Sequence, residues 1–241
     1  MTLSHGIHLH AASVTLNHRE ILPPLTLHLH EQRIGILGRN GSGKTTLLRL
    51  MAGLIAPTSG TVSIDGTDPA RRREVLPLLG ILFQNPDHQI LFPTVEEELA
   101  FGLRQLGQTA AEAARKVAAA LADEGRSHWA KVPVTTLSQG QRHYLCLLSI
   151  LLMNPATILL DEPFAGLDLP TVQRLQRRLD RLPQRLITIS HDPASLARAD
   201  RILWLDRGRV HADGPPDRVI PAFIAAMDQI GGQDADTDLA G

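Results

Sequence analysis

The chain has 241 residues, 43% of them hydrophobic, which is enough to bury one sizeable core. Its formal net charge is −1 and its aromatic content is 3%, so the composition argues against nucleic-acid binding, which relies on basic and stacking side chains. Cys146 is the sole cysteine, which excludes an internal disulfide and a cysteine-rich metal site and favours a reducing compartment.

The first strand patterns lie near the N-terminus. Residues 25–30, LTLHLH, alternate strictly between apolar and polar side chains, which predicts a half-exposed antiparallel strand. Four histidines alternate there and could align as a metal site, although solvent-facing strand positions explain them more simply; they are His8, His10, His28 and His30. The start, MTLSHGIHLH, lacks the basic and apolar regions of a signal peptide, and no apolar run reaches about 18 residues. We therefore expect a soluble, cytosolic protein that can still dock on a membrane partner.

Four continuous apolar runs predict buried strands of a parallel sheet. They are residues 34–37, 80–83, 157–160 and 186–189. With the alternating strand before them, they predict an α/β core with an antiparallel layer attached.

Residues 38–45, GRNGSGKT, fit the phosphate-binding loop G-x-x-x-x-G-K-[ST] and lie between a predicted strand and a helical pattern at 45–53. In such a loop backbone N–H groups surround phosphate oxygens, the lysine reaches the terminal phosphates and the last hydroxyl binds Mg²⁺. The predicted nucleotide-binding residues are Gly38, Arg39, Asn40, Gly41, Ser42, Gly43, Lys44, Thr45 and Thr46.

Between residues 94 and 153 the sequence shows three helical patterns and no convincing strand. Thr94, with Glu97 three residues later, predicts a capping box at the first helix start. Residues 109–122 are rich in alanine, and residues 139–153 carry apolar side chains at helical spacing. A helical insertion into the α/β core is the simplest interpretation. Two arginine-rich stretches, at 71–73 and at 174–181, are interpreted as exposed helix faces.

The strand at 157–160 ends in two carboxylates. Beside a phosphate-binding loop, Asp161 is predicted to hold Mg²⁺ through water, and Glu162 to orient and polarise the attacking water. The pattern is weak by itself and becomes strong with the loop upstream.

Residues 137–141, LSQGQ, open a helix and predict a second anion-binding site. They resemble the signature motif of ABC-type ATPases, usually LSGGQ, with a departure at Gln139. The resemblance covers about residues 7–220, with the motifs in the expected order. It implies that Gln84 is the Q-loop glutamine, that Asp168 in AGLD is the D-loop aspartate, and that His191 in ISHD is the switch histidine near the γ-phosphate.

The resemblance implies an α/β fold with a P-loop NTPase (RecA-like) core, an antiparallel β layer and an inserted helical subdomain. The expected division is a nucleotide-binding core at 1–84 and 156–230, and a helical signature subdomain at 85–155. The composition of residues 231–241 predicts a disordered acidic tail.

In ABC-type ATPases the signature of one chain closes over the ATP of another. The resemblance therefore implies a second ATPase chain, either an identical copy or a paralogue, with ATP and Mg²⁺ bound between them. Ser138, Gln139, Gly140 and Gln141 would face the partner's ATP. Mg²⁺ would be held by Thr45, Gln84 and Asp161, and catalysis would depend on Glu162, His191 and Gln84. The family usually stacks an aromatic on adenine, where this chain offers Leu16 or His18.

Residues 84–92, QNPDHQILF, and 94–102, TVEEELAFG, resemble ATPases of energy-coupling factor (ECF) transporters. Residues 161–170, DEPFAGLDLP, most resemble the biotin-transport ATPase within that group. The resemblance implies a peripheral subunit on the cytoplasmic face of the membrane, working with a transmembrane coupling protein and a substrate-binding membrane protein. Ile90, Leu91 and Phe92 are candidates for a groove that grips the membrane partner, or else for core packing.

Two alternatives stay open. One is an ECF-type importer of cobalt or nickel, which shares this type of ATPase. The other is a soluble ABC ATPase in regulation or nucleic-acid transactions, which the absence of a long coiled-coil insertion and of a second cassette disfavours.

Overall fold

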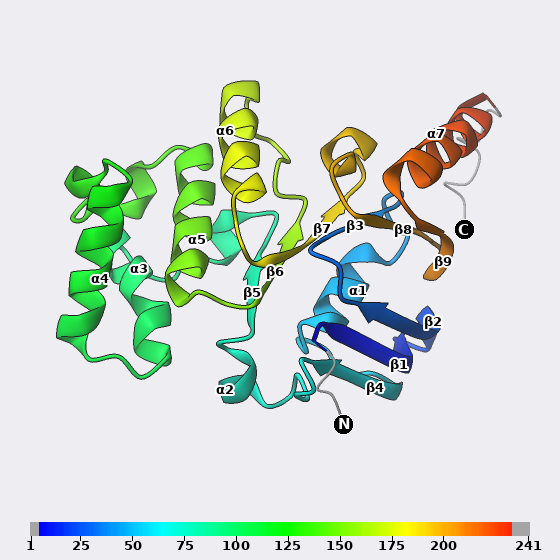
Figure 1. The fold of residues 1–241 in the computed structure, drawn as a ribbon, viewed down its shortest axis with the longest axis horizontal. Helices are drawn as coiled ribbons and strands as arrows, with labels where there is room; N and C mark the ends of the chain where they lie inside the picture. Colours follow the sequence, from blue (N-terminus) through cyan, green and yellow to red (C-terminus); the bar gives the residue numbers. More distant parts are fainter. Residues whose placement is uncertain (1–4, 233–241) are drawn as a thin grey trace.

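Two β-sheets enclose helix α1 (Lys44–Met51) and form the larger part of the molecule (Figure 1). A computed structural model describes residues 5–232 of the chain. The smaller sheet is antiparallel, with strand order β2-β1-β4. Its strands are β1 (Ile7–Leu16), β2 (Arg19–Leu29) and β4 (Ser59–Ile64). The alternating segment at 25–30 lies in β2 up to Leu29, so the predicted antiparallel layer is confirmed.

The larger sheet has the strand order β5-β6-β7-β3-β8-β9 and is parallel except for the last strand. Its strands are β3 (Arg33–Leu37), β5 (Leu79–Leu82), β6 (Thr157–Asp161), β7 (Arg185–Ser190), β8 (Arg201–Asp206) and β9 (Arg209–Gly214). The four apolar runs lie in β3, β5, β6 and β7, as predicted, except that β5 ends at Leu82, one residue before the end of its run. Because these strands run in the same direction, their carboxyl ends meet at one edge of the sheet.

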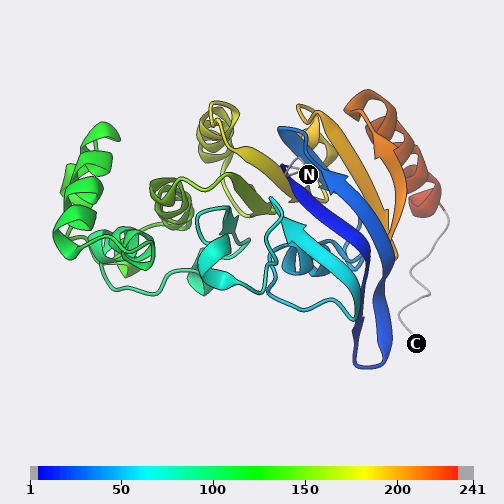
Figure 2. The same ribbon diagram turned by 60° about the horizontal axis from the view of Figure 1, so that its bottom comes forward.

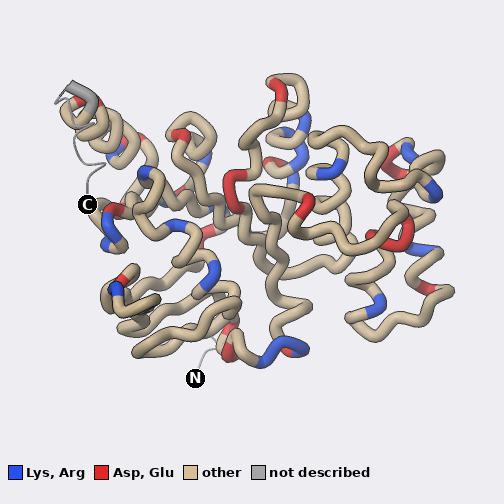
Figure 3. Tube along the Cα trace, turned by 180° about the vertical axis from the view of Figure 1, so that it is seen from behind, with Lys and Arg blue, Asp and Glu red and all other residues tan. Residues whose placement is uncertain are grey.

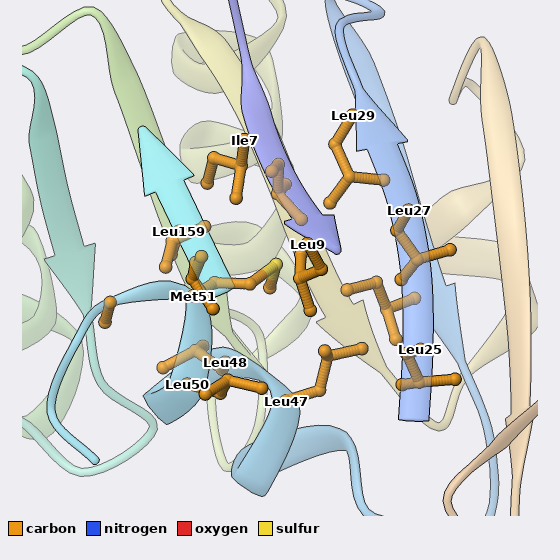
Figure 4. Packing of buried hydrophobic residues seen from close by; sticks show 14 of the residues in the cluster. Ile7, Leu9, Leu25, Leu27, Leu29, Leu47, Leu48, Leu50, Met51 and Leu159 are labelled. Carbon is orange, nitrogen blue, oxygen red and sulfur yellow. The ribbon is translucent and has the colours of Figure 1, made fainter. Parts of the chain in front are cut away.

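Helix α1 buries its apolar face between the two sheets (Figure 4). Leu47, Leu48 and Met51 are buried in one cluster with Ile7 and Leu9 of β1. Burying each such side chain contributes about 1.5–3 kcal/mol. This packing holds the helix that begins at the end of the phosphate-binding loop.

The segment between β5 and β6 is helical and contains no named strand. It has its own apolar core, and Figure 2 shows it extending away from the sheets. Its helices are η1 (Pro86–His88), α3 (Val95–Gln105), α4 (Ala110–Asp123), η2 (Ser127–Trp129), η3 (Val134–Thr136) and α5 (Gln139–Met153). The fold class is therefore the predicted one, an α/β P-loop core with an antiparallel layer and a helical insertion.

The capping box predicted at Thr94 is wrong. The Thr94 hydroxyl donates to the Glu97 carboxylate and caps no backbone N–H group. The capping box forms instead at Thr109, where the Glu112 N–H donates to the Thr109 hydroxyl at 3.3 Å and the Thr109 N–H donates to the Glu112 carboxylate at 2.8 Å.

The remaining helices are α2 (Arg72–Val75), α6 (Leu169–Asp180), η4 (Pro193–Leu196) and α7 (Pro216–Gly232). Helix α7 includes the first two residues of the predicted acidic tail, and the rest of that tail lies outside the described residues. Among residues 5–232, no helix is long and apolar enough to span a membrane.

Charged residues of both signs are interspersed along the chain (Figure 3). The arginines predicted on exposed helix faces are not all free of contacts, since Arg178 of α6 forms an ion pair with Glu124 at 2.8 Å. On the small sheet, His8 Nδ1 and His28 Nδ1 lie 2.9 Å apart. Within residues 5–232 no group of three or more histidine, cysteine or acidic side chains could hold a metal ion.

Candidate active site

The predicted site residues follow the carboxyl ends of four parallel strands. The phosphate-binding loop follows β3, Gln84 follows β5, and His191 follows β7, while Asp161 ends β6. These elements surround a pocket of about 320 Å³. The residues that line it are Ile21, Asn40, Gly41, Ser42, Gly43, Lys44, Thr45, Thr46, Gln84, Asp161, Glu162 and His191. Segments as far apart in the chain as Ile21 and His191 are thus brought together by the fold.

The loop wraps around the Lys44 side chain. Lys44 Nζ donates to the carbonyl oxygens of Gly38 at 2.7 Å and Arg39 at 2.9 Å. A Cβ at Gly38 would lie 2.4 Å from the Leu205 carbonyl oxygen, so only glycine fits there. Gly43, just before α1, has a φ of 98°, a left-handed conformation that favours glycine. The loop sequence therefore meets the steric demands of its own backbone.

Two charged side chains are buried at the base of the pocket. Burial lowers the pKa of Lys44, and the carboxylates of Glu162 and Asp161 oppose this effect. Burial also raises the pKa of Asp161, and the neighbouring Glu162 carboxylate adds to the increase, while Lys44 and Arg49 oppose it. The site therefore holds charges that solvent does not stabilise well, as expected where a polyanion and a cation bind.

Glu162 is held by several contacts at the end of β6. Its backbone has a φ of 47°, in the left-handed region that is unfavourable for a side chain other than glycine. Its carboxylate accepts the backbone N–H of His191 at 2.9 Å and lies 2.8 Å from His191 Nδ1. The Ser190 hydroxyl donates to the other carboxylate oxygen at 3.2 Å. Glu162 and His191 are therefore one connected pair, which the sequence motifs did not indicate.

The donor set suits ATP and Mg²⁺. The Ser42 hydroxyl is 5% exposed and has no hydrogen-bond partner among residues 5–232, so a phosphate oxygen would satisfy it. The exposed Thr45 hydroxyl, the Asp161 carboxylate and the Gln84 amide supply the oxygen ligands that Mg²⁺ prefers. Within this pocket, Lys44 is the ammonium group available for the terminal phosphates.

The residues after Gln84 separate into two groups. Ile90 is partly buried between the core of the helical segment and the cluster that joins α5 to the large sheet. Phe92 packs against Phe101 with ring centroids 5.1 Å apart. Leu91 is 67% exposed, and its N–H donates to the buried Glu98 carboxylate at 2.8 Å. Only Leu91 of the three candidate groove residues is therefore fully presented to the surface, and Glu98 holds it there.

The signature residues line a different pocket from the phosphate-binding loop. Ser138, Gly140 and Gln141 line a pocket of about 200 Å³ together with Leu167 and Thr171. The Ser138 hydroxyl accepts the Gln141 N–H at 3.3 Å and caps α5. Asp168 likewise caps α6, accepting the Thr171 N–H at 2.9 Å, a hydrogen bond that lowers the Asp168 pKa.

Two pocket contacts were missed from the sequence. Ile21 of β2 lines the nucleotide pocket, whereas Leu16 and His18, the residues expected in place of an adenine-stacking aromatic, do not. The Ser190 contact with Glu162 has a weak sequence signal, namely a hydroxyl at the end of an apolar strand. Ile21 has none, because its position depends on how the small sheet lies against the loop.

Comparison with known proteins gives consistent matches. A profile described as "ABC transporter" matches residues 24–165. The biotin transport ATP-binding protein BioM of Rhodobacter capsulatus is 52% identical over 208 residues, covering 86% of this chain and 89% of the relative. The cobalt import ATP-binding protein CbiO of Syntrophus aciditrophicus is 34% identical, covering 84% of this chain and 75% of the relative. The structure of cbiO1 from Clostridium perfringens, described as part of the ABC transporter complex cbiONQ, has a TM-score of 0.77 at 26% identity, covering 93% of this chain and 94% of that one.

Proposed function

The chain belongs to the ABC transporter family of ATP-binding proteins, and we propose that it hydrolyses ATP to drive an ECF-type importer of biotin. The observation that carries the ATPase proposal is the pocket that combines Lys44, Asp161, Glu162, Gln84 and His191. The 52% identity to a biotin transport ATP-binding protein supports the cargo.

In the proposed reaction, Lys44 neutralises charge on the terminal phosphates, and Glu162 accepts a proton from the water that attacks the γ-phosphorus. The bond from the γ-phosphorus to the bridging oxygen breaks, and ADP leaves with that oxygen. Thr45, Gln84 and, through water, Asp161 would hold Mg²⁺, which would neutralise negative charge on the phosphates. His191 contacts the Glu162 carboxylate at 2.8 Å and is positioned to orient it. The backbone N–H groups of the loop and the Ser42 hydroxyl supply further hydrogen bonds to phosphate.

We propose that two ATPase chains pair, as a homodimer or with a paralogue. The separation of the two pockets supports this: signature residues 138–141 contribute nothing to the lining of the pocket that holds Lys44. The signature of one chain would then complete the site of the other, with ATP binding closing the pair and product release reopening it. The caps at Ser138 and Asp168 present both helix starts at this interface.

The proposed membrane partners are a transmembrane coupling protein and a biotin-binding membrane protein, with this chain on the cytoplasmic face. Leu91, exposed beside the Q-loop and held by Glu98, is the proposed contact for the coupling protein. An importer of cobalt or nickel is the second candidate, favoured by the likeness to a cobalt import ATP-binding protein.

The test is co-expression with candidate membrane partners encoded beside this chain. The complex purified from membranes should bind biotin, and vesicles containing it should accumulate labelled biotin only with ATP. Uptake of Co²⁺ or Ni²⁺ instead of biotin would favour the second candidate. A chain that stays a soluble dimer and binds nucleic acid would contradict the transport proposal.

A further inference from the structure

The signature and the D-loop of the same chain are packed against each other. A Cβ added at Gly140 would lie 3.1 Å from Thr171 Cγ2, so helices α5 and α6 begin in close contact. Ser138 and Gly140 line the pocket of about 200 Å³ together with Leu167, which follows Gly166 in the D-loop. If the start of one helix is displaced, the start of the other must therefore move as well.

The Gln139 side chain makes the most direct of these contacts. A Cβ added at Gly166 would lie 3.1 Å from Gln139 Nε2 and 3.8 Å from its Cδ and Oε1. The amide group thus lies over the open face of Gly166. The φ of Gly166 is 71°, a left-handed conformation that favours glycine, and the lack of a side chain there leaves room for the amide. A glycine at 139, the residue usual in this motif, would leave the contact unmade.

Gly166 is connected to the proposed catalytic base by a short turn. The Ala165 N–H donates to the Glu162 carbonyl at 3.1 Å, and the Leu167 N–H donates to the Phe164 carbonyl at 3.3 Å. On its other side, Asp168 is fixed by capping α6. Displacement of Gly166 therefore acts on a segment whose first residue is Glu162.

We infer that Gln139 is a positioning residue that couples the signature of a chain to Glu162 of that chain, and so couples the two ATP sites of the pair. This rests on the proposed pairing of chains. The signature would contact ATP held by the partner, whereas Glu162 acts on ATP held by its own chain. ATP bound at one site would thus displace Gln139 and Gly166, and this displacement would change the position of Glu162, the base of the other site.

The experiment measures ATP hydrolysis by the assembled membrane complex over a wide range of ATP concentration. Gln139→Ala removes the contact, and Gln139→Met keeps the length and the packing but not the amide. Gln105→Ala, at an exposed position at the end of α3, is the matched control. Binding of ADP to each variant reports on the phosphate-binding loop separately.

The wild type and Gln105→Ala should hydrolyse ATP cooperatively, with a Hill coefficient between 1 and 2, the number of sites. Gln139→Met should keep a Hill coefficient above 1, whatever its rate, because its side chain still packs on Gly166. Gln139→Ala should show a Hill coefficient of about 1 and a kcat reduced about fivefold or more, with unchanged ADP affinity, because only the coupling is lost. If the role of Gln139 were purely structural, Gln139→Ala would also lower the ADP affinity or the expression of the protein.

Two outcomes would overturn the inference while leaving ATP-driven transport intact. One is Gln139→Ala with the cooperativity of the wild type, which would mean that the contact carries no coupling. The other is Gln139→Met behaving like Gln139→Ala, which would mean that the amide acts by a polar contact across the interface. Non-cooperative hydrolysis by the wild type would instead overturn the paired-site proposal, and this inference with it.

Discussion

At the residue scale, the nucleotide pocket holds charged groups at a cost to the folded protein. Lys44 and Asp161 are both buried. Burial lowers the pKa of Lys44 and raises the pKa of Asp161, so it favours the uncharged form of each. Their attraction to each other offsets part of this cost, but Glu162 lies beside Asp161 with the same sign of charge. The charged groups of this pocket therefore suit the proposed nucleotide site at the expense of the stability of the free chain.

Asp161→Asn should raise the thermal midpoint of the nucleotide-free protein at neutral pH. The folded-state pKa of Asp161 is raised, so its contribution to stability is present when it is protonated and is lost as pH rises through that pKa. The variant should thus be more stable than the wild type at neutral pH and lose this advantage in acid. Unfolding curves at a series of pH values measure the difference.

Asp168→Asn is the matched comparison, because the Thr171 hydrogen bond lowers the Asp168 pKa. Its contribution is present above the unfolded-state pKa and is lost as pH falls, so this variant should be less stable than the wild type at neutral pH. Shifts of the same sign in both variants would contradict the charge argument.

Ile21→Tyr should tighten nucleotide binding. Ile21 lines the pocket without the stacking surface of an aromatic ring, and an added aromatic contact is worth about 0.5–1.5 kcal/mol, or roughly two- to tenfold in Kd. Equilibrium titration with ADP measures the change. Leu16→Tyr is the control, since Leu16 is 46% exposed and should leave Kd unchanged. Tighter binding by the control alone would place the base beside Leu16.

At the element scale, a Ser or Thr followed three residues later by Glu or Gln stands at three helix starts, and it forms a capping box at two of them. Thr109 with Glu112 and Ser138 with Gln141 form capping boxes. At Thr94 the first N–H groups of α3 have other partners: Val95 donates to the Val132 carbonyl at 3.2 Å and Glu96 to the Ala130 carbonyl at 3.0 Å. Carbonyl groups of the loop after η2 thus accept hydrogen bonds from the start of α3, the role expected of the Thr94 hydroxyl.

Thr109→Ala should destabilise the protein by about 1 kcal/mol, which lowers the thermal midpoint by about 2–4 °C in a chain of this size. Thr94→Ala should cost less than about 0.5 kcal/mol, because its hydroxyl caps no N–H group. Thermal unfolding of both variants under the same conditions makes the comparison. Equal losses would mean that the Thr94 and Glu97 contact stabilises the helix as much as a cap does.

At the scale of the whole molecule, the helical segment joins the rest of the chain through the apolar packing of α5 on β5 and β6 and through polar contacts with α6. Glu124 at the end of α4 forms an ion pair with Arg178 of α6 at 2.8 Å, and Tyr144 of α5 also donates to Glu124. Burial and this contact raise the pKa of Tyr144 to about 12, so the phenol stays protonated at neutral pH. The signature is thereby held against the segment that follows Glu162.

Glu162→Gln should lower the hydrolysis rate by about 100-fold or more, since general base catalysis contributes that much. ATP should then hold two chains together, and light scattering should report a dimer with ATP and a smaller species with ADP. Glu74→Gln, at an exposed surface pair with Arg71, should hydrolyse ATP at the wild-type rate. An unchanged rate in Glu162→Gln would remove Glu162 from the role of base.

Strands β3, β5, β6 and β7 and the positions of the site motifs were predictable because each is local. An apolar run, a glycine loop and a carboxylate at a strand end carry their own structural consequences, and β3, β5, β6 and β7 appear where the runs indicated. Strands β8 and β9 were not predicted. Strand β8 is a short apolar run, and β9 shows no clear alternation between buried and exposed residues.

By itself, the sequence determined the fold class, the phosphate-binding loop and the residues that follow each strand. Only the tertiary structure decided that Glu162 contacts His191, that Ile21 lines the pocket, and that Gln139 covers Gly166. The physical reason is that these contacts join segments far apart in the chain. Which of them meet depends on strand order and on how helices α5 and α6 pack, and a pattern within one short stretch specifies neither.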